Sequence, residues 1–254
     1  MATRFIKVEY NKQTYDICVD SHDTRSNLVE TRKGTQEGKV KTWMNIIKQT
    51  TVDCIYDIGS NYGEFLIPII ERTNTHIHAF EPNISVFNCL NHSVSRFKNN
   101  NVFIHNAAIG NSTDDVILNI PNSSGNASLE LKYVKHKNNV THQLVKQYDI
   151  ASILKDLDSF VMKIDVEGIE HLILRRIQDV DNFKSYCIMF EFNRFGDVDA
   201  LDSINDFLIG KHVMGISNSE KKLTKSNFMI YADGDIHRLN NSHDIIVSKN
   251  IEWK

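Results

Sequence analysis

Apolar and polar residues alternate along the start of the chain, over residues 5–19. A polar turn at residues 11–13 divides the alternating segment in two, so it is predicted to form a β-hairpin. Residues 21–38 are mainly polar. Apolar residues then recur at helical spacing from Val40 to Ile47, which predicts an amphipathic helix ending before residue 52.

From residue 51 onward, short apolar runs of strand length alternate with helical patterns. The predicted strands are Cys54–Ile58, His76–Phe80, Val102–Asn106, Phe160–Ile164, Cys187–Glu191, Val213–Ile216 and Phe228–Tyr231. The predicted helices cover residues 63–72, 84–97, 168–177 and 198–208. This alternation is typical of an α/β fold with a mostly parallel sheet covered by helices on both faces. We therefore expect a seven-stranded sheet within residues 51–254, preceded by a hairpin-and-helix extension over residues 1–50.

Residues 111–147 interrupt this alternation. Residues 116–120 have the composition of a strand, whereas residues 121–128 are small and polar, as in a mobile loop. We expect this loop and the N-terminal extension to lie over the functional site and to shape it for a substrate.

Composition and charge exclude several classes of protein. The chain has 254 residues and a net charge of −3, which argues against a polyanion such as nucleic acid as its main partner. Its cysteines form no C-x-x-C pair, so neither a zinc nor a redox motif is indicated. No apolar run approaches the roughly 18 residues of a membrane span, and no apolar signal region follows the start, so we expect a cytoplasmic protein.

The most informative segment is Asp57-Ile58-Gly59-Ser60-Asn61-Tyr62-Gly63, which follows an apolar strand and precedes a helical pattern. Glycine at such a turn lets the backbone approach a ligand, and the helix start offers free N–H groups. The G-x-x-x-G spacing differs from the G-x-G-x-x-G of nicotinamide cofactors and suits a ligand without a pyrophosphate. S-adenosylmethionine is such a ligand, and Asp57 would attract its cationic end. Alternatively, Asp57 and the glycines only shape the turn.

Further candidate cofactor residues follow the next two strands. Glu81 ends the second strand, where a carboxylate is well placed to accept hydrogen bonds from both hydroxyls of an adenosine ribose. Asn83 is placed to cap the following helix. After the third strand, Asn106 offers hydrogen bonds to adenine and Ala107 leaves room for a flat ring, although this pattern is also common at strand ends.

Two acidic residues end the last parallel strands of the predicted sheet, Asp165 and Glu191. Because ligands bind beyond the carboxyl ends of parallel strands, we expect both carboxylates beside the cofactor. One role is a general base for an acceptor hydroxyl. The other is a site for Mg²⁺ or a similar ion, with Asn193 as a third ligand. Lys163 shares a strand face with Asp165 and is expected to pair with it.

The segments DIGSNYGEF, AFEPN, NAAIG and KIDVEGIEHLIL occur in this order, and their combination resembles the FkbM family of S-adenosylmethionine-dependent methyltransferases. The resemblance covers residues 51–193 and implies a class I methyltransferase (Rossmann-like) fold and O-methylation, often of sugar hydroxyls in glycans. The positions that match the family's cofactor residues are Asp57, Gly59, Asn61, Gly63 and Glu81, and those that match its acceptor-side signature are Asp165, Glu167 and Gly168. Ser60 replaces a frequent alanine.

We therefore expect an O-methyltransferase that acts on a sugar hydroxyl of a glycan, with Asp165 as base or metal ligand. The alternatives are a small metabolite or a nucleic-acid 2′-hydroxyl as the acceptor, or a non-catalytic scaffold that keeps the fold. Nucleic acid is disfavoured because the lysines that follow Lys163 come only at Lys184 and Lys211, far from the acidic residue in sequence.

Overall fold

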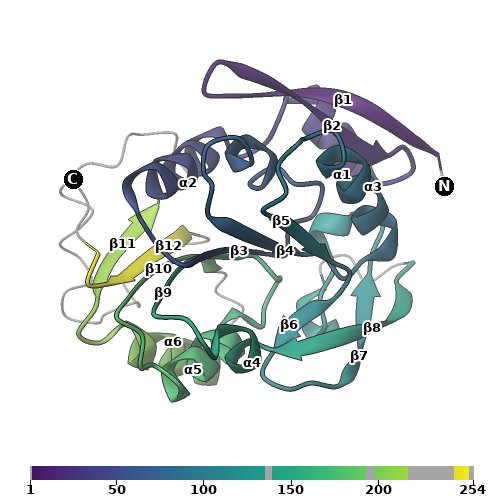
Figure 1. Ribbon diagram of the computed structural model, residues 1–254. Coiled ribbons are helices and arrows are strands. Elements are labelled where there is room, and N and C mark those ends of the chain that lie inside the picture. Colours follow the sequence, from purple (N-terminus) through teal and green to yellow (C-terminus); the bar gives the residue numbers. More distant parts are fainter. Residues whose placement is uncertain (1, 135–138, 193–197, 217–242, 252–254) are drawn as a thin grey trace.

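The computed structural model describes residues 2–134, 139–192, 198–216 and 243–251 of the chain (Figure 1). Its N-terminal segment forms an antiparallel hairpin of β1 (Thr3–Tyr10) and β2 (Gln13–Asp20). Alternate residues of β1 are buried because successive side chains of a strand point to opposite faces. The predicted hairpin is confirmed.

The centre of the molecule is a seven-stranded sheet, counted within the part of the chain that is described. Its strands in spatial order are β11 (His212–Ile216), β12 (His243–Lys249), β10 (Ser185–Phe192), β9 (Ser159–Ile164), β3 (Cys54–Ile58), β4 (His76–Phe80) and β5 (Val102–His105). β12 is antiparallel to both neighbours, and the pairs from β10 to β5 are parallel. The expected mostly parallel seven-stranded sheet is therefore confirmed.

One strand of the sheet differs from the prediction. The predicted strand Phe228–Tyr231 lies outside the described residues. The sheet's remaining position is filled by β12, which we did not predict, although its residues 245–247 are all buried. Such a short apolar run near the end of the chain is easily taken for part of a loop.

The helices cover both faces of the sheet (Figure 1). One layer contains α2 (Glu37–Gln49), the 3₁₀ helix η1 (Ile67–Ile69) and α3 (Ile84–Val94). The other contains α4 (Ile150–Leu154), α5 (Glu170–Asp179) and α6 (Val198–Leu208). Side chains of the hairpin, of α2 and of α3 belong to one buried cluster. The expected division of the chain into an extension over residues 1–50 and a domain over residues 51–254 stays a prediction. No helix in the described ranges is long and apolar enough to cross a membrane.

Two helix predictions need correction. The helix expected over residues 63–72 is wrong, because only the short η1 forms there. Gly63 has a left-handed φ of +89°, and Pro68 lacks the N–H that a continuing α-helix requires. Conversely, the polar stretch 21–38 contains α1 (Thr24–Thr31), capped by Asp23. Its buried face is narrow, which explains why apolar periodicity did not reveal it.

A second, three-stranded sheet is formed by β6 (Ala108–Gly110), β8 (Thr141–Asp149) and β7 (Asp115–Ile120), in that order. β7 confirms the predicted strand at 116–120. Two 3₁₀ turns follow it, η2 (Ser124–Asn126) and η3 (Leu131–Tyr133). The expected loop over residues 121–128 is held by hydrogen bonds to the start of α1: Thr24 donates to the carbonyl of Asn122 (3.2 Å), and the N–H of Ser124 donates to Asp23 Oδ1 (3.1 Å).

Candidate functional site

A pocket opens at the carboxyl ends of β3, β4, β9 and β10. Its volume is about 910 Å³, including open solvent at its mouth. Of the predicted site residues, those that line it are Gly59, Asn61, Glu81, Ala107, Asp165 and Glu191. Those that lie outside its lining are Asp57, Ser60, Gly63, Asn83, Asn106 and Lys163. The pocket therefore brings together the two groups of residues that were predicted for the cofactor and for the reaction.

Gly59 lines the pocket, and its lack of a side chain is also required by a neighbouring strand end. Its φ is +76°, a conformation that favours glycine, and a Cβ placed on it would lie 1.9 Å from the carbonyl oxygen of Asp165. The glycine thus allows the ends of β3 and β9 to approach one another, where the N–H of Asp165 donates to the carbonyl of Ile58 (3.0 Å). Gly63 likewise faces protein, because its Cβ would lie 2.8 Å from Leu90 Cδ1.

Asp57 is fully buried and lies outside the lining of the pocket. Its Oδ1 lies 3.7 Å from Lys163 Nζ. Burial raises the pKa of the Asp57 carboxyl, and the charge of Lys163 counteracts part of that rise. Ser60 closes the turn below it by donating its hydroxyl to the Asp57 carbonyl (2.8 Å). The alternative in which Asp57 shapes the turn describes these contacts better than direct attraction of a cation.

Glu81 lines the pocket and is held by two backbone donors. Its Oε2 accepts from the N–H of Asn61 (2.9 Å) and its Oε1 from the N–H of Asn83 (2.8 Å). The side chain is almost fully buried, and burial raises its pKa to about 7 against the lowering effect of these hydrogen bonds. Glu81 therefore changes its charge close to neutral pH.

The two asparagines predicted beside Glu81 support backbone. Asn83 caps α3 by accepting from the N–H of Ser85 (3.0 Å), which confirms that prediction. Asn106 donates its amide to the carbonyls of Glu81 (2.9 Å) and Pro82 (3.0 Å). Ala107 lines the pocket as a small apolar residue.

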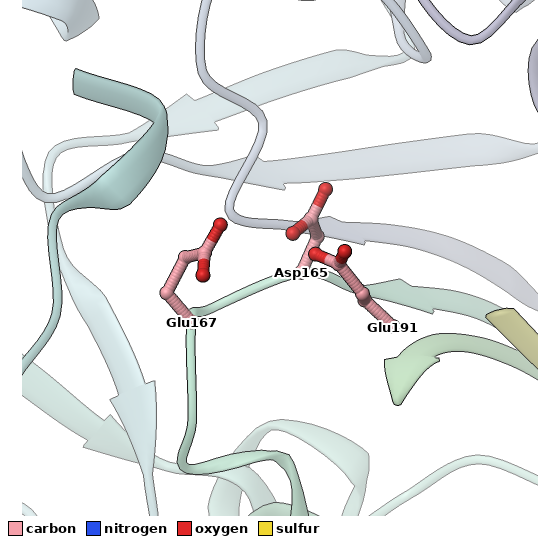
Figure 2. Close-up of side chains that lie close together, drawn as sticks. All are labelled: Asp165, Glu167 and Glu191. Atoms are coloured by element: carbon pink, nitrogen blue, oxygen red, sulfur yellow. The ribbon is translucent and has the colours of Figure 1, made fainter. Parts of the chain in front are cut away.

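Three carboxylates meet at the reaction end of the pocket. Figure 2 shows Asp165 at the end of β9 beside Glu191 of β10, with Glu167 turned toward them from the following loop. Each offers an oxygen, and these oxygens all lie within 4.8 Å of one another. Glu167, which matches the family's acceptor-side signature, has a left-handed φ of +55° before the helix begins and belongs to this acidic cluster. Asn193 lies outside the described residues.

Buried lysines compensate part of this negative charge. Lys163 Nζ lies 3.3 Å from Asp165 Oδ2, which confirms the predicted pair. Burial opposes ionisation of Asp165, but the charges of Lys163 and Lys39 outweigh it and lower its pKa to about 2. Burial and the neighbouring Asp165 charge raise the pKa of Glu191 to about 9. Burial and mutual repulsion therefore favour one proton on this pair of carboxyl groups, and the neighbouring lysines favour the ionised form of Asp165.

Sequence patterns did not reveal the contributions of the N-terminal extension. Lys39 of α2 forms an ion pair with the buried Asp244 of β12 and acts on the charge of Asp165. Arg25 of α1 lines the pocket and forms an ion pair with Glu64 (2.6 Å). Neither cation belongs to a sequence motif. The one available signal is Glu64, a charged residue at the start of the apolar segment after Gly63, which indicates a buried partner of opposite charge.

The signature after β9 supports the backbone of the acidic loop. Glu170 accepts from the N–H groups of Val166 (3.3 Å) and Gly168 (2.9 Å), and burial raises its pKa to about 8. Gly168 has a φ of +113°, and a Cβ there would lie 2.4 Å from the ring of Tyr133.

Comparison with solved structures finds methyltransferases of low sequence identity. A precorrin-6y C5,15-methyltransferase from Geobacter metallireducens GS-15 has a TM-score of 0.45 and 12% identity over 85% of this chain and 88% of its own. TYW2 of M. jannaschii, solved in complex with AdoMet, has a TM-score of 0.44 and 12% identity over 96% of this chain and 84% of its own. No curated protein sequence is significantly similar to the chain.

The family comparison is more specific. The model of the methyltransferase FkbM domain matches residues 57–215, which is more than half of the chain. The match includes the turn after β3, Glu81, the acidic residues that follow β9, and Glu191 of β10. The chain therefore belongs to the FkbM family of S-adenosylmethionine-dependent methyltransferases and has the class I, Rossmann-like α/β fold that its motifs implied.

Proposed function

We propose that this protein methylates a hydroxyl oxygen of a saccharide acceptor, with Asp165 as the base that removes the hydroxyl proton. The observation that carries the proposal is the position of the Asp165 carboxylate, which lines the same pocket as Glu81. A sugar hydroxyl is a poor nucleophile at neutral pH, so its oxygen needs a nearby proton acceptor while it bonds to the methyl carbon. S-adenosylmethionine, when bound, supplies that methyl group on a cationic sulfur.

The residues of the pocket fit an adenosine. Glu81 presents a carboxylate of which each oxygen already accepts one backbone N–H, which leaves lone pairs for two ribose hydroxyls. Phe80, Ala107 and Ile109 provide apolar wall beside it. We propose that Glu81 holds the ribose and that Asn61 and Gly59 form the turn beneath it. Asp57 is buried under this turn and would support it without contacting the donor.

The lysines favour the base over the metal. Asp165, Glu167 and Glu191 have the oxygen ligands that a hard divalent cation prefers. However, the charges of Lys163 and Lys39 already compensate part of the negative charge of Asp165. A divalent cation such as Mg²⁺ would have to compete with both. We therefore propose that Asp165 acts as a base and that the reaction proceeds in the presence of a chelator.

Lys39 also gives weight to a second acceptor, the 2′-hydroxyl of a nucleic acid. Lys184 and Lys211, the lysines that follow Lys163, are far from Asp165 in sequence. Lys39 precedes it and still acts on Asp165. The net charge of −3 and the ion pairs of Lys39 and Arg25 with Asp244 and Glu64 leave little free positive charge for a polyanion, so the saccharide remains our proposal.

The proposal is tested by incubating the protein and S-adenosylmethionine labelled at its methyl group with fractionated glycans, RNA and small metabolites. We expect label in the glycan fraction as an alkali-stable methyl ether, with and without EDTA, and mass spectrometry then locates the methylated hydroxyl. Label that ribonuclease releases would favour the nucleic-acid acceptor. Alkali-labile label would identify a methyl ester and contradict O-methylation of a hydroxyl. Loss of transfer with EDTA alone would favour the metal.

Replacement of Glu81 by alanine is expected to weaken binding of S-adenosylmethionine by about 1–3 kcal/mol, because two hydrogen bonds to the ribose are lost. Isothermal titration calorimetry with S-adenosylhomocysteine measures the same contact without turnover. Glu130→Ala, at a partly exposed position outside the pocket, is the matched control and should bind as the wild type does. Unchanged affinity of the Glu81→Ala variant would contradict the assignment of the ribose to Glu81.

Donor affinity is expected to fall as the pH is lowered from 8 to 6. Burial raises the pKa of Glu81 to about 7, so protons compete with the ribose for its carboxylate below that pH. For a donor that binds only the ionised form, this competition increases Kd about tenfold over the interval. Calorimetry at several pH values measures the change. Glu81→Gln should bind more weakly but with a flat profile over the same range, and an equally steep profile for this variant would assign the dependence to another group.

A further inference from the structure

Arg25 connects the N-terminal extension to the turn beneath the pocket. Its Nη2 lies 2.6 Å from Glu64 Oε2, and its Nε donates to Asn61 Oδ1 (3.2 Å). The side chain is only 18% exposed. Gly125 lies directly against it, since a Cβ there would be 2.7 Å from Arg25 Nη1. The guanidinium is therefore fixed between α1, the turn after β3 and η2.

Asn61 carries this contact onward to Glu81. It has a left-handed φ of +48°, which costs energy for a residue with a side chain and must be held by surrounding contacts. In this conformation its N–H donates to Glu81 Oε2 (2.9 Å). Arg25 holds the side-chain oxygen of the same residue, and Ser124 Oγ accepts from its amide nitrogen (3.2 Å). Arg25 is thus one residue removed from the carboxylate proposed to hold the ribose.

Glu64 has other partners besides Arg25. Its Oε1 accepts from the Tyr10 hydroxyl (3.0 Å) and from both the N–H and the hydroxyl of Thr35 (3.1 and 2.5 Å). A residue whose only task was to satisfy Glu64 would not need a second donor aimed at Asn61. A lysine at position 25 would retain the ion pair with Glu64 but has no equivalent of the Nε donor. The two contacts of Arg25 can therefore be separated by substitution.

We propose that Arg25 is a positioning residue for methyl-donor binding, acting through the side chain of Asn61 on the N–H that Asn61 donates to Glu81. This rests on the proposed role of Glu81 in donor binding. The N-terminal extension then helps to build the donor site in addition to any contact with the acceptor. Its link to Asn61 places Arg25, which also lines the pocket, among the determinants of donor affinity.

A double-mutant cycle tests this proposal in the full-length protein. Arg25→Lys is expected to weaken S-adenosylhomocysteine binding about 3- to 10-fold, the effect of one hydrogen bond, as measured by calorimetry. Asn61→Gly removes the side chain that Arg25 holds and tolerates the left-handed φ. In the Asn61→Gly background, Arg25→Lys should change Kd by less than about twofold, because the link is already absent.

A merely structural role would give a different result. If Arg25 only anchors α1, Arg25→Lys lowers the melting temperature but leaves Kd unchanged. Alternatively, it weakens binding equally in the wild type and in the Asn61→Gly variant. Either outcome overturns the proposal. Arg176→Lys is the matched control, because Arg176 pairs with Asp149 (2.9 Å) outside the pocket. This variant should bind S-adenosylhomocysteine as the wild type does. Should Arg25→Lys fail to fold, Asn61→Gly alone must weaken binding. Normal binding by Glu81→Ala would contradict the proposed donor site itself, independently of Arg25.

Discussion

Substitution of Asp165 by asparagine is expected to reduce methyl transfer by about 10²- to 10⁴-fold, the contribution typical of a positioned general base. The amide cannot take the proton of an acceptor hydroxyl, although it keeps the shape of the carboxylate. Donor affinity should change little, because the proposed ribose contact is to Glu81 after β4, a strand that β3 separates from β9. The experiment compares initial rates on the methylated glycan fraction with Kd for S-adenosylhomocysteine.

Asp179→Asn is the matched control for this substitution. Asp179 is on α5 with a side chain that is 54% exposed, so its loss should leave both transfer and binding unchanged. Transfer by the Asp165→Asn variant at a rate close to that of the wild type would exclude Asp165 as the base. A variant that no longer bound the donor would instead indicate that Asp165 supports the pocket, since Lys163 would then be left with Asp57 as its nearest carboxylate partner.

The parts of this fold that could be predicted are those with a strong local pattern. β3 and β4 were predicted to the residue, because each is a short apolar run followed by a glycine or proline turn. Placement of Glu81, Asp165 and Glu191 at one edge of the sheet followed from a general property of parallel strands, namely that their carboxyl ends meet. The pocket confirms this placement.

The cations of the site could not be predicted in the same way. Lys39 and Arg25 precede Asp165 by more than a hundred residues and reach the site through the packing of α1 and α2 against the rest of the protein. Neither residue belongs to a motif. Arg25 is in α1, a polar helix whose narrow buried face gives no clear periodicity, and Lys39 is a polar position of α2, whose periodicity identifies only its apolar residues. The charge state of Glu191 depends on these neighbours and on burial, which residue spacing alone does not contain.

Glycine spacing indicated where the site is, but it could not show that Gly59 is also needed for contact between two strand ends. Gly59 was predicted to admit a ligand, yet the space where its side chain would project is filled by the backbone of Asp165. A ligand and a neighbouring strand impose the same requirement on the sequence, which is a residue without a Cβ. Only the position of β9 distinguishes the two.

Gly59→Ala is therefore expected to destabilise the protein itself. A Cβ at this position would lie 1.9 Å from the Asp165 carbonyl oxygen, and that atom is backbone of a central strand end and cannot rotate away. The φ of +76° adds the cost of a left-handed conformation for alanine. Together these terms cost about 2–5 kcal/mol, which for a chain of this size lowers the melting temperature by roughly 4–20 °C. Differential scanning calorimetry measures this change in melting temperature.

Gly38→Ala separates this effect from a general consequence of replacing glycine. Gly38 lies in α2, its φ is not positive, and a Cβ there would meet nothing within 4 Å. Alanine should be neutral or stabilise the helix by up to about 1 kcal/mol. A Gly59→Ala variant as stable as the wild type would mean that the ends of β3 and β9 can move apart. Because Asp165 sits on the strand end that must move, such a variant should then lose methyl transfer while remaining folded, so the two substitutions together distinguish a rigid strand junction from one that yields.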